Sequence, residues 1–255
     1  TMGALHEGHL ALVDAALAQA DLVVVSIFVN PAQFAPHEDF DRYPRDLTGD
    51  AEKLAQRGVA LIYAPDRAVM YPDGYQTTVQ LGPIAAPMEG RFRPGFFTGV
   101  ATVVSKLLLQ VEPNVAVFGE KDYQQLCVIK QLVADLDIDV EINGRPTERE
   151  PDGLALSSRN AYLAPSERLA APQLHRGLQT IATELAAGKA FAPLQDAAIT
   201  ALKTAGFEAP DYLDLRDAET LMPLVAAGDR PGRLLVAAKL GSTRLIDNIP
   251  VPPIS

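Results

Sequence analysis

The chain has 255 residues, 48% of them hydrophobic and 21% charged, a balance typical of a globular protein with a sizeable core in one large or two modest domains. Its formal charge of −10 and the lack of a clustered basic segment argue against a nucleic-acid partner. The single cysteine excludes an internal disulfide, and no apolar run is long enough to span a membrane, so we expect a cytoplasmic protein without a membrane partner.

The first half of the chain alternates apolar runs with amphipathic segments. We expect helices over residues 10–20, 47–57, 99–111 and 123–136, and strands over residues 22–29, 59–63, 115–118 and 138–142. Residues 23–29 are apolar on both faces, as in a central parallel strand that helices cover. The pattern predicts an α/β fold with a Rossmann-like, doubly wound parallel sheet.

A composition change near residues 145–152, which are rich in Arg, Pro, Glu and Asp, predicts a linker between domains. Beyond it we expect a helix started by Pro165 or Ser166 with a break at Pro172, a helix over 194–205, and strands over 212–215, 233–238 and 243–246. These elements predict a smaller α+β domain, so the expected domains are 1–147 and 148–255. Because the chain opens directly on a turn of the kind that follows a strand, we also expect a strand before Thr1 in the natural polypeptide.

That opening turn contains His6-Glu7-Gly8-His9, which places two imidazoles three residues apart at the start of a predicted helix. Gly8 lets a ligand approach the backbone, and the free amides and positive dipole of a helix N-terminus attract anions. The turn therefore predicts a phosphate site. On these residues alone, a pair of surface histidines or a zinc half-site remains an alternative.

Further polar residues follow two other predicted strands. Asn30 and Gln33 come after the first, and residues 119–125 come after a later one. Because ligands bind at the carboxyl ends of parallel strands, we expect these segments and the histidine turn to converge on one crevice. On local grounds, Asn30 and Gln33 are equally suited to an Asx turn beside Pro31.

Other reactive side chains have simpler interpretations. Tyr43 suits packing as well as closure over a site. Cys127 lies among apolar residues of a predicted helix, where we expect it in the core. His37 and His175 lack partners at the spacing of a ligand or catalytic set, and we expect them at the surface.

Six segments taken together resemble one family. They are TMGALHEGH (residues 1–9), FVNPAQF (28–34), RYPR (42–45), FGEKDYQQL (118–126), LSSRN (156–160) and TRLIDN (243–248). In this order they are similar to the pantothenate synthetases, the pantoate–β-alanine ligase family of the HxGH/KMSKS nucleotidyltransferases. Residues 157–159 stand in the place of the KMSKS loop, so the resemblance implies that the C-terminal domain is a lid.

The resemblance implies a ligase reaction in two steps and a homodimeric enzyme. ATP and pantoate give pantoyl adenylate and pyrophosphate with Mg²⁺, and β-alanine then displaces AMP to give pantothenate. A carboxylic acid with a pKa of about 4 is already ionised at neutral pH, so its attack on phosphorus needs no general base. The protein must supply positive charge and orientation.

The resemblance also assigns roles residue by residue. The catalytic set is His6, His9, Lys121 and Arg159; the ATP set comprises these four with Met2, Gly3, Gly119, Asp122, Leu156, Ser157 and Ser158; and the pantoate set is Thr1, Met2, Asn30, Gln33 and Gln125. Mg²⁺ is expected to bind through ATP, with Asp122 near either the metal or the ribose. In one departure from the family, Phe96 stands where a histidine is usual.

Two other functions remain open from the sequence. An adenylyltransferase acting on a phosphate-bearing acceptor would need Arg or Lys in the acceptor site, whereas Gln33 and Gln125 are neutral amides. A non-catalytic nucleotide-binding module would accommodate the Phe96 departure. Pyrophosphate release from ATP and pantoate separates that module from the two enzymes.

Overall fold

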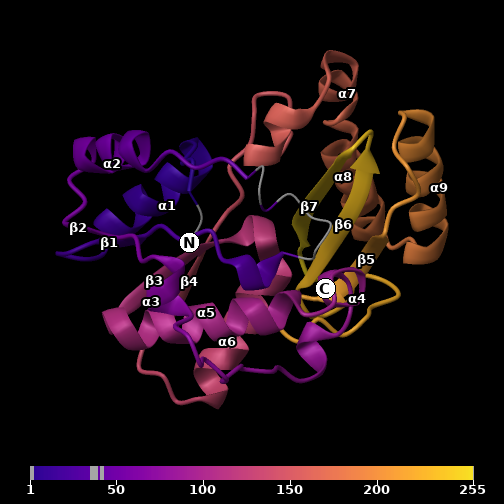
Figure 1. Cartoon of the computed structure of the whole chain (residues 1–255). Helices are drawn as coiled ribbons and strands as arrows, with labels where there is room; N and C mark the ends of the chain where they lie inside the picture. Colours follow the sequence, from indigo (N-terminus) through magenta and orange to yellow (C-terminus); the bar gives the residue numbers. More distant parts are fainter. Residues whose placement is uncertain (1–2, 35–39, 41–42, 255) are drawn as a thin grey trace. The chain divides into compact units, whose positions relative to one another are not determined.

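The computed structural model describes residues 3–34, 40 and 43–254 (Figure 1). The described chain divides into two units. The N-terminal unit comprises the described residues up to Glu120 together with Gln124–Pro146, and the C-terminal unit comprises Lys121–Tyr123 together with the described residues from Thr147 onward. Thr1, Met2 and His37, which carry sequence predictions, lie outside the described residues.

Parallel strand pairs form the middle of the N-terminal unit. Strand β1 (Val24–Ser26) pairs with β2 (Leu61–Tyr63), with Val25 opposite Ile62. Strand β3 (Val115–Gly119) pairs with β4 (Glu141–Arg145), with Val117 opposite Asn143. Both pairs are parallel, which confirms the predicted α/β class, although the described residues form two short ladders rather than one continuous sheet.

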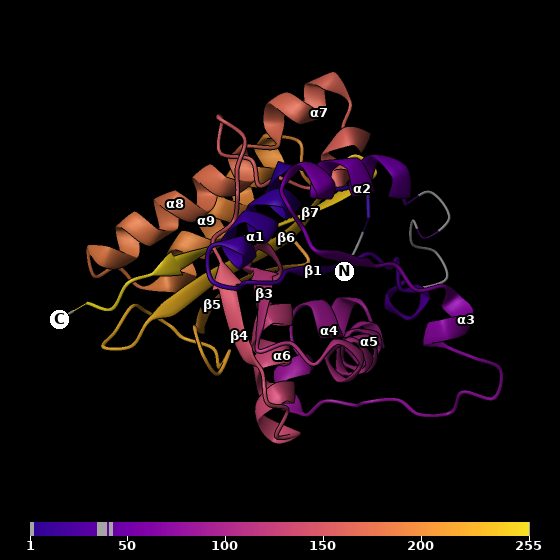
Figure 2. The same cartoon turned by 90° about the vertical axis from the view of Figure 1, so that its left-hand side faces the viewer.

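Helices cover these strands on two faces (Figure 2). On one face, α1 (Glu7–Leu17) and α2 (Leu47–Gln56) bury Leu10 and Leu54 against Val25 of β1 and other residues. On the other, α5 (Phe96–Val111) and α6 (Tyr123–Asp135) bury Val103 and Ile129 in a cluster with Phe118 of β3. The short helices α3 (Arg67–Met70) and α4 (Glu89–Phe92) lie in the connection between β2 and α5. Apolar periodicity thus predicted the covering helices.

Several element boundaries differ from the prediction, among them the ends of β1, α5, α9 (Phe191–Thr204) and β7 (Thr243–Val251), and two of the differences have identifiable reasons. Helix α1 begins at Glu7 rather than at residue 10, because His6 caps it by accepting a hydrogen bond from the backbone of Gly8. Strand β4 begins at Glu141 rather than at residue 138, because Asp137 adopts a left-handed conformation (φ 51°) and Ile138 still donates to the carbonyl of Val133.

The C-terminal unit is an antiparallel sheet covered by helices on one face (Figure 1). The sheet has the order β5 (Tyr212–Asp217), β6 (Gly232–Leu240) and β7 (Thr243–Val251). Helices α8 (Gln173–Ala186) and α9 (Phe191–Thr204) pack on it, and Ile181 shares a buried cluster with Leu234. Helix α7 (Pro165–Ala170) ends just before Pro172, as the predicted break requires.

The expected linker is fixed along its second half. The Arg149 guanidinium donates to both carboxylate oxygens of Asp247, each at 2.8 Å, and to the carbonyl of Gly153 at 3.0 Å. Gly153 has a φ of 97° and lies against the ring of His175. The prediction that His175 lies at the surface is wrong. Its side chain is 12% exposed, and its Nδ1 is 3.3 Å from Asp247 Oδ2.

Asp247 makes the stability of the C-terminal unit depend on pH. Burial raises the pKa of this carboxyl group, but the neighbouring His175 and Arg149 lower it further, so the pKa lies below its ordinary value of 3.8. A folded-state pKa below the unfolded-state value gives stability that is complete above the ordinary value and is lost as the pH falls through the folded-state value. We therefore expect Asp247→Asn to reduce the loss of unfolding free energy between pH 6 and pH 3, measured by urea denaturation.

At neutral pH the same variant should be less stable than the wild type by at most about 3–5 kcal/mol, because it leaves the partly buried Arg149 without its counter-charge. Asp152→Asn is the matched control. The pKa of Asp152 is also lowered, chiefly by its hydrogen bond from Arg168, but this pair is about one-third exposed and should contribute little. Identical pH dependence in Asp247→Asn and the wild type would contradict the prediction.

Candidate functional site

The two histidines of the opening turn are fixed by the backbone of helix α1. His6 Nδ1 accepts from the Gly8 amide at 3.1 Å, and His9 Nδ1 accepts from the His6 amide at 3.4 Å. Their rings stack with centroids 3.9 Å apart. Because Nδ1 is the acceptor in each ring, the neutral imidazole carries its proton on Nε2. The turn therefore places two imidazole rings at a helix N-terminus, a position suited to phosphate.

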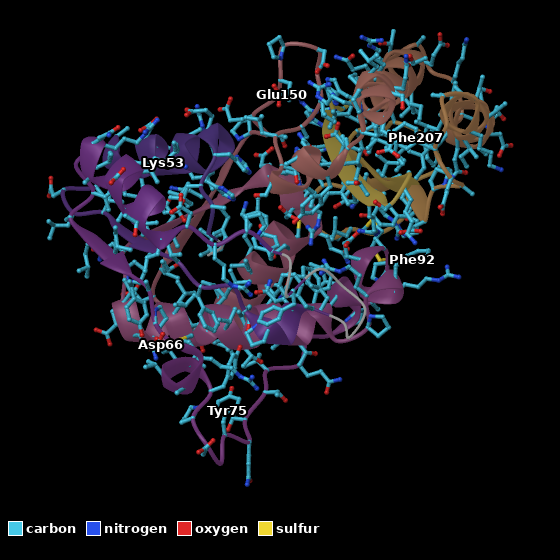
Figure 3. All side chains as sticks on the ribbon, turned by 45° about the horizontal axis from the view of Figure 1, so that its top comes forward. Lys53, Asp66, Tyr75, Phe92, Glu150 and Phe207 are labelled. Carbon is cyan, nitrogen blue, oxygen red and sulfur yellow. The ribbon has the colours of Figure 1, made fainter. Side chains whose placement is uncertain are left out.

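Helix α2 holds this turn through two side chains that the sequence analysis missed. Asp50 is fully buried and accepts from the amides of Ala4 and Leu5 at 2.8 and 2.6 Å. Lys53, labelled in Figure 3, donates from Nζ to the carbonyl of Leu5 at 2.7 Å. Asp50 and Lys53 lie three residues apart on one helix face, which is the only local signal for their shared role.

Asn30 organises the loop that follows β1. Its Nδ2 donates to Gln33 Oε1 and to the carbonyl of Gly99, and its Oδ1 accepts from the Ala32 amide and from the Tyr71 hydroxyl at 2.8 Å. Burial raises the pKa of Tyr71 to about 12, so its hydroxyl remains a donor at neutral pH. All four hydrogen-bonding positions of the Asn30 amide are therefore used within the protein. This pattern suits a residue that orients Gln33.

A buried connection joins the Gln33 loop to the start of α6. Gln124 donates to the carbonyls of Ile84 and Pro87 and accepts from the Glu89 amide. The Glu89 carboxylate forms an ion pair with Arg93, with Oε2 and Nη1 3.6 Å apart. Arg93 in turn donates to the carbonyl of Gln33 at 3.0 Å. The N-terminal unit thereby brings the loop carrying Gln33 near the first turn of α6, which carries Gln125. Gln125 is half-buried, and neither its amide nor Gln33 Nε2 has a hydrogen-bond partner among the described residues.

Phe96, noted in the sequence analysis, lies against the Arg93 guanidinium, whose carbon is 3.8 Å from the ring centroid. This is the geometry of a cation–π contact. A pocket of about 150 Å³ adjoins Arg93 and Gly95, and its lining includes none of the predicted site residues. Tyr43 is buried and packs edge-on against Phe34, and Cys127 is buried in the core as predicted.

The remaining predicted ATP residues lie mainly in the C-terminal unit. Ser157 caps the 3₁₀ turn Ser158–Tyr162 by accepting from the Arg159 amide at 3.2 Å, and Leu156 donates to the Glu148 carbonyl. Ser158 Oγ is buried without a partner among the described residues. Lys121 is half-buried and Asp122 exposed, whereas Gly119 ends β3 in the N-terminal unit. The structure thus groups Lys121 with residues 156–159, and the histidine turn with Asn30, Gln33, Gly119 and Gln125.

The described residues bear on two expectations from the sequence, a possible zinc site and the absence of a membrane span. Within residues 3–34, 40 and 43–254, no group of three or more His, Cys, Asp or Glu side chains is arranged to hold a metal ion. The zinc half-site considered for His6 and His9 therefore lacks further ligands in this part of the chain. No helix in the described ranges is both long and apolar enough to cross a bilayer.

Comparison with known proteins gives matches along the whole chain. The sequence profile of the family described as pantoate-beta-alanine ligase matches residues 1–250. The pantothenate synthetase of Rhodospirillum rubrum is 56% identical over 251 residues, which cover 98% of this chain and 89% of the relative. That of Caulobacter vibrioides is 53% identical over 253 residues, with the same two shares. The resemblance thus extends far beyond the six motifs.

Solved structures agree with these relatives. The crystal structure of pantothenate synthetase from Thermus thermophilus matches with a TM-score of 0.93 and 49% identity, covering 99% of this chain and 91% of that chain. The pantoate-beta-alanine ligase from Francisella tularensis, complexed with beta-gamma ATP and beta-alanine, matches with a TM-score of 0.82 and 36% identity. This second match covers 97% of the present chain and 86% of the other, so both units are included.

The anchoring of the histidine turn is testable through Asp50. Asp50→Ala leaves two buried amides without an acceptor, at about 1–3 kcal/mol each, and should lower the free energy of unfolding accordingly. It should also accelerate hydrogen exchange at Ala4 and Leu5. Asp46→Ala is the matched control, because it removes only the cap of the same helix, worth about 1 kcal/mol. Unchanged exchange at Ala4 and Leu5 in Asp50→Ala would argue against the anchor.

Proposed function

Because the chain belongs to the pantoate–β-alanine ligase family, it is an enzyme that ligates pantoate to β-alanine, and we propose that the reaction passes through a pantoyl adenylate. In the first step the pantoate carboxylate attacks the α-phosphorus of ATP, and pyrophosphate leaves. In the second the β-alanine amine attacks the acyl carbonyl, loses a proton, and expels AMP. Of the functions left open by the sequence, family membership selects the ligase.

The observation that carries the proposed chemistry is the tautomer of the paired histidines. With Nδ1 of His6 and His9 engaged by backbone amides, the neutral tautomer that fits carries its proton on Nε2, the nitrogen that we propose to donate to phosphate. Donors already oriented toward phosphate oxygens stabilise the charge that develops on them during transfer. Such a site needs no nucleophile of its own, because the substrate carboxylate is ionised at neutral pH.

Lys121, Arg159 and the two serines supply the rest of the proposed phosphate site. The Lys121 ammonium and Arg159 guanidinium would balance the charge of the triphosphate, which matters in a chain whose formal charge is −10. Ser158 Oγ, buried without a protein partner among the described residues, suits an oxygen of the nucleotide. Met2, Gly3, Gly119 and Leu156 complete the proposed ATP set, where their backbone could approach the nucleotide.

The proposed pantoate site rests on two amides. Gln33 and Gln125 can both donate and accept, as a substrate with two hydroxyls and a carboxylate requires. Asn30 is proposed to hold Gln33 in place, since its own amide is fully used by the protein. Thr1 and Met2 are retained as proposed pantoate residues on the family resemblance alone.

Mg²⁺ is proposed to bind chiefly through the nucleotide. Asp122 is an exposed carboxylate next to Lys121, and the described residues offer no cluster of three ligands. A donor set of this kind fits a hard cation held by phosphate oxygens, water and at most one protein carboxylate. Bound there, the metal would neutralise part of the triphosphate charge. The homodimer implied by the family resemblance likewise remains a prediction.

Loss of a phosphate-binding group should abolish most of the first step. We expect His9→Ala and Lys121→Ala each to lower pantoate-dependent ATP–pyrophosphate exchange by ~10²-fold or more, the usual effect of removing an oriented charge-stabilising donor. Stability in urea should change little for Lys121→Ala and by about 1 kcal/mol for His9→Ala, which loses the capping contact with the His6 amide. Near-wild-type exchange in both variants would refute the assignment.

Substrate recognition should separate from nucleotide recognition at Gln125. Gln125→Ala should raise the KM for pantoate strongly, since each unpaired polar group in the complex costs ~1–3 kcal/mol. ATP binding, measured by calorimetry, should remain nearly unchanged.

The neighbouring Gln124→Ala provides the contrast, because Gln124 bonds only to protein backbone and its loss should reduce stability. Equal weakening of ATP and pantoate binding in Gln125→Ala would show that Gln125 is a structural strut.

A further inference from the structure

The segment Lys121–Tyr123 belongs to the C-terminal unit, although its neighbours in the chain, Glu120 and Gln124, belong to the N-terminal unit. Contacts with the C-terminal sheet and its loops explain this. Asn248 Nδ2 donates to the carbonyl of Lys121 at 2.8 Å, and the Tyr123 hydroxyl donates to the carbonyl of Ala218 at 2.9 Å. The Arg233 guanidinium lies 4.0 Å from the centroid of the Tyr123 ring.

Asn248 is itself held rigidly. It is 3% exposed on strand β7, and its Oδ1 accepts from Arg233 Nε at 2.7 Å. Its backbone amide donates to Asp247 Oδ1 at 2.7 Å, and Asp247 is in turn clamped by Arg149. Asn248 is therefore fixed at its oxygen and its backbone while its Nδ2 holds the peptide of Lys121.

Strand β7 also packs against the 3₁₀ turn Ser158–Tyr162. That turn carries Ser158 and Arg159, which belong to the proposed ATP site. One strand of the antiparallel sheet therefore supports both phosphate-binding segments of this unit: the turn through packing, and the Lys121 segment through a side-chain hydrogen bond.

We propose that Asn248 is a positioning residue for the adenylation step, acting through Lys121. It fixes the Lys121 backbone in register with residues 158 and 159, so that the ammonium and guanidinium groups meet the triphosphate from one rigid body. This inference rests on the proposed role of Lys121 in ATP binding. A displacement of about 1 Å in a catalytic group can lower the rate by about 10²-fold. Losing the single hydrogen bond that holds the Lys121 backbone should therefore lower the rate of adenylation.

The test is a double-mutant cycle between Asn248 and Lys121, measured by pantoate-dependent ATP–pyrophosphate exchange. Asn248→Ala should lower kcat/KM for ATP by about 10-fold while leaving the KM for pantoate near the wild-type value. In the Lys121→Ala background the same substitution should have almost no further effect, because the group it positions is gone. Tyr123→Phe, which removes the hydroxyl that donates to Ala218, should cause a smaller loss in the same direction.

Ile181→Val is the matched control for stability, since it removes one methyl group from a core cluster of the same unit whose members do not include the Lys121 segment. It should leave the kinetics of ATP unchanged. If Lys121→Ala is impaired but Asn248→Ala is not, or if the two effects multiply fully, the positioning role is overturned while the proposed function stands. If Lys121→Ala itself retains full exchange, both are overturned.

Discussion

The loops of this protein depend on buried carboxylate and amide side chains that satisfy their backbone. A turn that leaves the sheet loses its ladder partners, and an unpaired buried amide or carbonyl is costly. Asp50 meets this need for the histidine turn, Asn30 for the loop after β1, and Asn248 for the Lys121 segment. In each case the supporting side chain comes from a helix or strand, or from the residue that caps the turn, so the loop takes its geometry from rigid structure.

This dependence divides the polar residues of the motifs into two groups with different chemistry. Asn30 and Gln124 use their amides inside the protein and fix the geometry of the loops around them. Gln33 retains its Nε2 donors and Gln125 its side-chain amide, which no described residue engages and which we propose to serve a ligand. Residue type is the same in both groups. Only the structure separates the residues that build the site from those proposed to contact substrate.

The sequence predicted the elements well where the signal is local. Apolar periodicity located helix α2 within one residue, and the break at Pro172 appeared where proline cannot continue a helix. It was less accurate where a capping side chain sets the first residue of a helix, as His6 does for α1, and where a residue in the left-handed conformation follows a helix, as Asp137 does after α6. These signals depend on one side chain or one backbone angle, which a periodic pattern does not register.

The candidate site was predicted only in part, for a similar reason. Asp50 pairs with Leu5 across 45 residues and Asn248 with Lys121 across 127, and such long-range pairs leave no trace in spacing or composition.

The stacked histidines and the two cations of the proposed phosphate site differ in the charge that they carry. His6 and His9 are stacked with ring centroids 3.9 Å apart, a distance at which two positive rings would repel by about 1–4 kcal/mol, depending on the local dielectric. Neutral rings avoid this repulsion. In the proposed ATP set, the residues with full positive charge are Lys121 and Arg159. We therefore propose that the histidines contribute by orientation and the two cations by charge, because stabilising the transferred adenylyl group calls for both.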